Sequence, residues 1–126
     1  MYSHNMVGSN DVAKSKKFYD ATFEAMGGKP GIQDDKGRLI YMHDGGLFLV
    51  TPPINGEPAC GANGGTIGFA AASAEQADAW HAAGVANGGT AIEDAPGVRE
   101  AAFGKLYLAY LYDPCGNKIC AMHRMG

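Results

Sequence analysis

The sequence predicts an α+β fold: two tandem βαβββ modules whose curved mixed sheets surround a cleft. Three observations predict it: two helix patterns, a short apolar strand pattern before each helix, and hairpin-like strand patterns after each helix. Half of the 126 residues separate Asn10 from Ser73, the expected starts of the two helices. The offset between the repeats therefore equals half the chain, which indicates an internal duplication.

The first helix is expected over residues 10–26. Asn10 or Asp11 can cap its start, and Gly27-Gly28 ends it. Its apolar stripe, at helical spacing, consists of Val12, Phe18, Tyr19, Phe23 and Met26.

The second helix is expected to begin at Ser73, because Ser73 and Gln76 have the spacing of a capping box. Ala77, Trp80 and Ala83 form its buried stripe, and Gly88-Gly89 end it. The two helices thus match in position and in their glycine ends.

Strands are expected on both sides of each helix. His4–Val7 and Thr66–Ala71 precede the helices, whereas Leu47–Val50 and Lys118–Ala121 occupy equivalent positions after a turn in each half. Lys105–Tyr112 is apolar on both faces, which indicates a central strand. We therefore expect one domain, with modules over 1–58 and 66–126 joined by the glycine-rich linker 59–65.

Composition limits the possible partners. Hydrophobic residues make up 46% and charged residues 18%, as in a folded globule. Ten Lys and Arg are outnumbered by thirteen Asp and Glu and are not clustered, so we expect no nucleic-acid partner. No apolar stretch approaches membrane-spanning length, so we expect no membrane partner either.

The cysteines favour a reducing compartment. Cys60, Cys115 and Cys120 are an odd number in a chain long enough to bury a core without disulfides. The first residues also lack the basic flank and apolar run of a signal peptide. A cytoplasmic protein is expected.

The duplicated βαβββ pattern carries two specific motifs. Residues 12–20 (VAKSKKFYD) and the turn 112–119 (YDPCGNKI), together with His4 in the first strand, strongly resemble the glyoxalase/bleomycin-resistance/extradiol-dioxygenase superfamily, also called the vicinal oxygen chelate (VOC) fold. The resemblance covers essentially the whole chain. It implies a cleft whose floor holds a divalent metal that activates a small substrate by Lewis-acid chemistry. Members commonly form dimers, so a homodimer is expected, in some cases with each cleft shared between two chains.

Alignment with that family places four residues at its metal positions: His4, Leu49, Thr66 and Cys120. Leu49 cannot bind a metal and Thr66 is a poor ligand, so only His4 and Cys120 keep ligating atoms. Two ligands are too few for a stable catalytic site. The expected metal site is therefore degenerate. We expect the protein to have no cofactor, and a divalent metal (Zn, Ni, Mn or Fe) is the alternative.

Two functional interpretations stay open. The first is a protein that binds a small, largely apolar molecule in a cleft lined by these four residues and nearby tyrosines. The alternative is a metal-dependent lactoylglutathione-lyase-like or dioxygenase-like enzyme, with His4 as ligand or base, Thr66 as donor and Cys120 as ligand or nucleophile. The aromatic residues expected to shape the pocket are Tyr41, Phe48, Tyr107 and Tyr110.

Other candidate residues receive simpler interpretations. His43 is interpreted as an exposed strand-end residue, and His81 as lying on the solvent side of the second helix. Cys115, Cys120 and His123 have zinc-like spacing but are divided between a turn and a strand. Arg99 and Glu100 are expected in a loop near the cleft.

Overall fold

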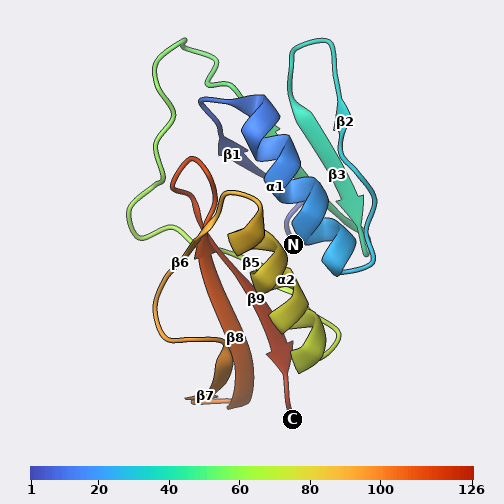
Figure 1. Cartoon of the computed structure of the whole chain (residues 1–126), viewed down its shortest axis with the longest axis vertical. Coiled ribbons are helices and arrows are strands. Elements are labelled where there is room, and N and C mark those ends of the chain that lie inside the picture. The colour runs from blue at the N-terminus through green and yellow to red at the C-terminus, as the bar shows by residue number, and fades with distance from the viewer.

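The computed structural model describes residues 1–126, and its two halves follow one another along the chain (Figure 1). The elements of the first half are β1 (Asn5–Gly8), α1 (Val12–Ala25), β2 (Ile32–Gln33), β3 (Leu39–His43) and β4 (Gly46–Thr51). Those of the second half are β5 (Ile67–Ala70), α2 (Ala74–Ala86), β6 (Thr90–Ala91), β7 (Gly97–Ala101), β8 (Gly104–Tyr112) and β9 (Lys118–Arg124). The predicted α+β fold with two repeated units is confirmed.

Each half forms its own mixed sheet. The first sheet has the order β1-β4-β3-β2, and the second has the order β5-β9-β8-β6 with β7 also paired to β8. In both sheets the first strand lies parallel to the last strand of its half, and the other pairs are antiparallel. The duplication is therefore visible in the strand order as well as in the sequence.

The second half contains one strand more than expected. Arg99 and Glu100 lie in β7 and pair with Leu106 and Lys105 of β8, so the expectation of a loop there was wrong. Because β8 is nine residues long, β6 and β7 can pair with different parts of the same edge. The short, polar β7 sequence carries no alternating pattern that would have predicted this.

The helix starts agree with the sequence. The carboxylate of Asp11 accepts a hydrogen bond from the Lys14 N–H at 3.1 Å, and the Ser73 hydroxyl accepts one from the Gln76 N–H at 3.0 Å. Each cap satisfies a backbone donor that has no partner within its helix. Neither helix has the length and apolar character that a membrane crossing requires.

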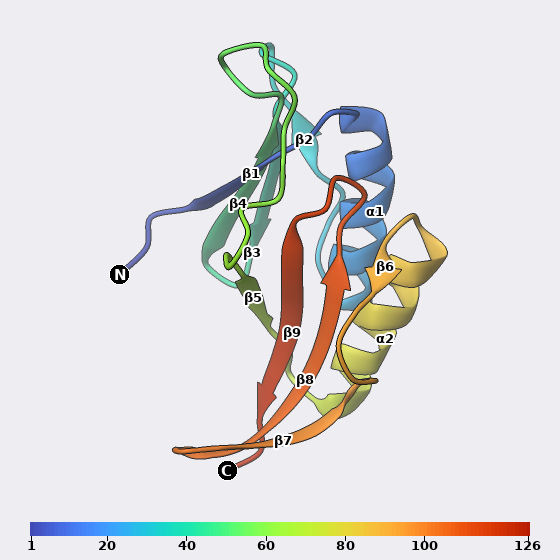
Figure 2. The same cartoon turned by 90° about the vertical axis from the view of Figure 1, so that its left-hand side faces the viewer.

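One continuous core joins the two halves. Phe18, Tyr19 and Phe23 of α1 and Trp80 of α2 belong to the same cluster of buried side chains. The helices lie side by side on one side of the molecule, with the sheets behind them (Figures 1 and 2). A Cβ on Gly84 would collide with the Leu111 side chain, so this glycine allows α2 to approach β8 closely.

The turn between β8 and β9 fastens the second half to the first. Asn117 Nδ2 donates to the carbonyl of Gly8 at 3.0 Å and to Asp113 Oδ2 at 2.8 Å. The other carboxylate oxygen of Asp113 accepts hydrogen bonds from the backbone N–H groups of Cys115 and Asn117, each at 2.9 Å. The motif that carried the family resemblance therefore orders the turn and holds β1.

Candidate ligand pocket between the modules

The four residues aligned with the family's metal positions are divided between the two modules, and His4 and Thr66 lie one residue before the strands that were expected to contain them. His4 precedes β1 and is exposed, and Leu49 lies in β4 opposite Met6. Thr66 precedes β5 and is exposed, whereas Cys120 is buried in β9 opposite Gly68. No group of three or more His, Cys, Asp or Glu side chains anywhere in the chain could hold a metal ion.

The donor set does not fit a divalent metal. Leu49 has no donor atom and Thr66 offers only a poor, neutral hydroxyl ligand. Only His4 and Cys120 keep ligating atoms, and two ligands are too few for a stable site. The zinc-like motif also does not form a metal site from Cys115, Cys120 and His123. Cys115 lies in a turn, and His123 Nδ1 is 3.1 Å from the Ala71 carbonyl.

The predicted tyrosines occupy three different environments. Tyr41 is buried toward α1, where its hydroxyl donates to Asp20 at 2.7 Å, and burial followed by this hydrogen bond raises its pKa. The Tyr107 hydroxyl donates to Asp78 of α2 at 2.7 Å. Tyr110 pairs with Cys120 and, by strand alternation, lies on the opposite face of β8 from Tyr107. These side chains do not line one common cleft within the chain.

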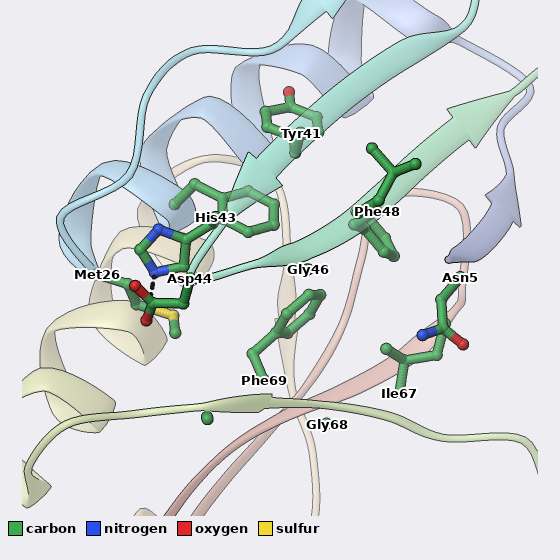
Figure 3. Close-up of a pocket in the computed structure, with 13 residues that line it drawn as sticks. Asn5, Met26, Tyr41, His43, Asp44, Gly46, Phe48, Ile67, Gly68 and Phe69 are labelled. Carbon is green, nitrogen blue, oxygen red and sulfur yellow. Dashed lines mark ion pairs between the residues drawn. The ribbon is translucent and has the colours of Figure 1, made fainter. Parts of the chain in front are cut away.

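A cavity of about 210 Å³ lies between the two modules (Figure 3). Its lining comes from the end of α1, the end of β3, the start of β4, the start of β1, and β5. Of the aromatic residues expected to shape a pocket, Tyr41 and Phe48 line it.

Aromatic side chains from both modules form its wall. Phe69 of β5 meets Phe23 and Phe48 edge-on, with ring centroids 5.4 and 5.2 Å apart. Phe23 in turn stacks on Tyr41 at 4.7 Å. Each ring of this wall therefore packs against at least one other ring.

Polar groups lie at two places around the apolar wall. His43 Nε2 is 3.3 Å from Asp44 Oδ2 at the end of β3, and Asn5 lies toward the other side (Figure 3). The His43 side chain is only 17% exposed, whereas that of Asp44 is 78% exposed. The apolar body of a small molecule could pack against the aromatic wall, and a polar group on it could contact one of these polar side chains.

His43 ends strand β3, as expected, but the interpretation of it as exposed was wrong. Its ring lies 5.9 Å from that of Phe23 and lines the cavity. Strand alternation could have predicted the inward orientation of His43. It follows Leu39 and Tyr41 at two-residue spacing, and both of these side chains are in the core. His81 is half-buried, and desolvation lowers its pKa.

Comparison with known proteins identifies close structural relatives. A crystal structure of a glyoxalase/bleomycin resistance protein from Albidiferax ferrireducens T118 has 59% sequence identity and a TM-score of 0.95, covering 98% of this chain and 99% of that chain. A glyoxalase/bleomycin resistance protein/dioxygenase family enzyme from Burkholderia phytofirmans PsJN is 18% identical, with a TM-score of 0.73 and 98% of both chains covered.

A lactoylglutathione lyase from Agrobacterium tumefaciens is 20% identical, with a TM-score of 0.65, and the match covers 95% of this chain and 91% of that one. No family model matches the sequence. No curated protein matches it either.

Proposed function

Because the chain belongs to the glyoxalase/bleomycin resistance protein family, we propose that it binds a small, mostly apolar organic molecule in the cavity between its modules. The observation that carries this proposal is the cavity of about 210 Å³ with an aromatic wall and a His43–Asp44 pair at its edge. Apolar walls with a few polar groups are the usual composition of small-molecule sites. The proposal requires no metal.

The size of the cavity limits the ligand. Sites for drug-sized molecules measure about 300–1,000 Å³, and a cavity of about 150 Å³ is enough for benzene. At about 210 Å³ this cavity matches a molecule with a single ring. We therefore propose an aromatic or alicyclic ring with one short substituent.

The charge at the edge limits the substituent. The Asp44 carboxylate accepts hydrogen bonds and attracts positive charge, and the faces of aromatic rings also attract cations. No lysine or arginine lines the cavity. An amine is therefore the preferred substituent, followed by a hydroxyl group, and a carboxylate is disfavoured.

A thermal-shift series tests the ligand class. Benzylamine, phenol and benzoate share one ring and differ in charge, so the melting temperature should rise most with benzylamine and least with benzoate. Asp44→Asn removes the charge and keeps an amino acid that tolerates the left-handed backbone at this position, where φ is 49°. This variant should lose the preference for benzylamine over phenol.

A pocket-filling variant tests the location. Ala70 and Ala72 are both exposed, but only Ala70 lines the cavity. Ala70→Leu should abolish the stabilisation by benzylamine, and the matched variant Ala72→Leu should retain it. Equal responses of both variants would place the ligand elsewhere.

The enzymatic alternative predicts a different result. A lyase-like or dioxygenase-like protein using His4 and Cys120 would bind Zn, Ni, Mn or Fe stoichiometrically and lose it in His4→Ala. Metal analysis of protein purified without a chelating tag separates the two functions. A bound metal of that kind would make the enzyme the better hypothesis.

We also propose that the protein is a cytoplasmic homodimer whose partner copy covers the outer face of the first sheet. Strand pairing places Met6, Leu49, Ile40 and Ile32 in one apolar row across all four strands. Met42, beside this row, is 68% exposed. Such a contiguous apolar face favours association. Met42→Lys should yield monomers in light scattering, whereas Val85→Lys on exposed α2 should not.

A further inference from the structure

Two of the three cysteines belong to chain segments that lie against each other. Cys60 is exposed in the connection between β4 and β5, and Cys115 is half-buried in the turn between β8 and β9. The side-chain amide of Asn10 bridges them: Nδ2 is 3.1 Å from the carbonyl of Ala59 and 3.3 Å from Cys115 Sγ. The residue before Cys60 and the sulfur of Cys115 thus share one donor.

The residue after Cys60 is held against the same turn. A Cβ built on Gly61 would overlap the Gly116 carbonyl oxygen, so the two backbones are in direct contact there. Asn10 Oδ1 also accepts a hydrogen bond from the Ala59 N–H at 2.6 Å, which fixes the connection on its other side. Both neighbours of Cys60 are therefore fastened next to Cys115 or Gly116.

We propose that Cys60 and Cys115 form a reversible disulfide that fastens the connection between the modules to the 113–117 turn. A disulfide needs Cα atoms about 4.4–6.8 Å apart, and the contact of Gly61 with Gly116 brings the residues next to Cys60 and Cys115 together. Cys60 is exposed and therefore accessible to small oxidants. Cys115 is half-buried and would react second, with the oxidised Cys60.

The oxidant is a low-molecular-weight disulfide, written RSSR. The Cys60 thiolate attacks one of its sulfur atoms, forms a mixed disulfide and releases one RS⁻. The Cys115 thiolate then attacks the Cys60 sulfur and releases the second RS⁻. Two protein thiols lose two electrons in total, RSSR gains them, and the two released protons convert RS⁻ to RSH.

The bond would join parts of the chain that are distant in sequence. The turn already holds β1 through Asn117 and Gly8, and the connection leads directly into β5. A disulfide closing this long loop restricts the unfolded chain, so the oxidised protein should melt at a higher temperature. β1 and β5 both contribute to the cavity, so oxidation also limits their relative movement.

Cys120 provides an internal control. It is buried in β9, and desolvation raises its pKa to about 11, so it should remain a thiol in the folded protein. Cys120→Ser should therefore leave the reaction unchanged. Cys60→Ser and Cys115→Ser should each abolish it.

The test is redox titration of the full chain with mixtures of glutathione and glutathione disulfide, followed by alkylation and peptide mass spectrometry. The expected result is loss of two thiols per chain, a cross-linked peptide containing Cys60 and Cys115, and a melting temperature that rises on oxidation and returns to its original value on reduction.

The variant Cys115→Ser should instead accumulate a glutathione adduct on Cys60. The wild type accumulating that same adduct, or forming only covalent dimers, would overturn the proposal, independently of whether any ligand binds.

Discussion

The hydroxyl of Tyr19 donates a 2.6 Å hydrogen bond to the carboxylate of Asp113, joining α1 of the first module to the β8–β9 turn of the second. Both residues are buried. Burial, followed by the charge and hydrogen bond of Asp113, raises the pKa of Tyr19 well above its usual value. A buried carboxylate needs such donors, and Tyr19 supplies one that the turn itself cannot.

Tyr19→Phe should therefore destabilise the whole fold. It removes one donor from the buried Asp113 while leaving the ring in the core, which costs about 1–3 kcal/mol of unfolding free energy. Urea denaturation measures this, with the exposed Tyr2→Phe as the matched control. A change below about 0.5 kcal/mol, as expected for a surface substitution, would contradict the importance of this bond.

Asp20 should contribute to stability in a pH-dependent manner. Partial burial opposes the shift, but hydrogen bonds from Lys16, Gly31 and Tyr41 lower the pKa of its carboxyl below the usual value. A lowered folded-state pKa gives stability that is present above the unfolded-state pKa and is lost as pH falls through the folded-state value.

Asp20→Asn should accordingly reduce stability at pH 7 and make the decline of stability below about pH 4 less steep. Denaturation curves between pH 2 and pH 7 measure both effects. Asp35→Asn, at an exposed turn position, is the control and should leave the profile unchanged. An acid decline in Asp20→Asn as steep as in the wild type would contradict the prediction.

Cys120 should react slowly with alkylating reagents. Its pKa of about 11 leaves roughly one thiolate in a thousand molecules at pH 8, and burial further limits access. Timed labelling with iodoacetamide under reducing conditions should modify exposed Cys60 first and Cys120 only after unfolding. Labelling of Cys120 at the rate of Cys60 would favour a nucleophilic role for Cys120.

Gly61→Ala should separate the intermodule connection from the 113–117 turn. The added methyl group would overlap the Gly116 carbonyl, and such overpacking costs about 1–3 kcal/mol. Thermal or urea unfolding measures the loss, and Gly97→Ala, whose Cβ would make ordinary contacts at 3.4 Å, is the control. Equal stability of the two variants would show that the contact is not constrained.

The repeated elements were predictable because local chemistry specifies them. Asp11 and Ser73 cap their helices, and the 112–119 motif forms the turn between β8 and β9. Strand β7 was not predictable, because Val98, Arg99 and Glu100 are ordered by the long neighbouring β8.

The lining of the cavity was even harder to predict from the sequence. Asn5, Phe23, His43 and Phe69 come from four separate elements, and only the packing of one module on the other brings them together. Alignment with a family identifies positions that the family uses. It gave His4, Leu49, Thr66 and Cys120, none of which lines this cavity, whereas Tyr41 and Phe48 of the predicted pocket aromatics do.

Two-dimensional NMR of the isotopically labelled protein during titration with benzylamine tests the central proposal most directly. We expect the largest saturable shifts at the amides of Asn5, His43 and Phe69, which line the cavity from three strands. Shifts centred instead on Met6, Leu49 and Cys120, or no saturable shifts at all, would contradict a binding site between the modules.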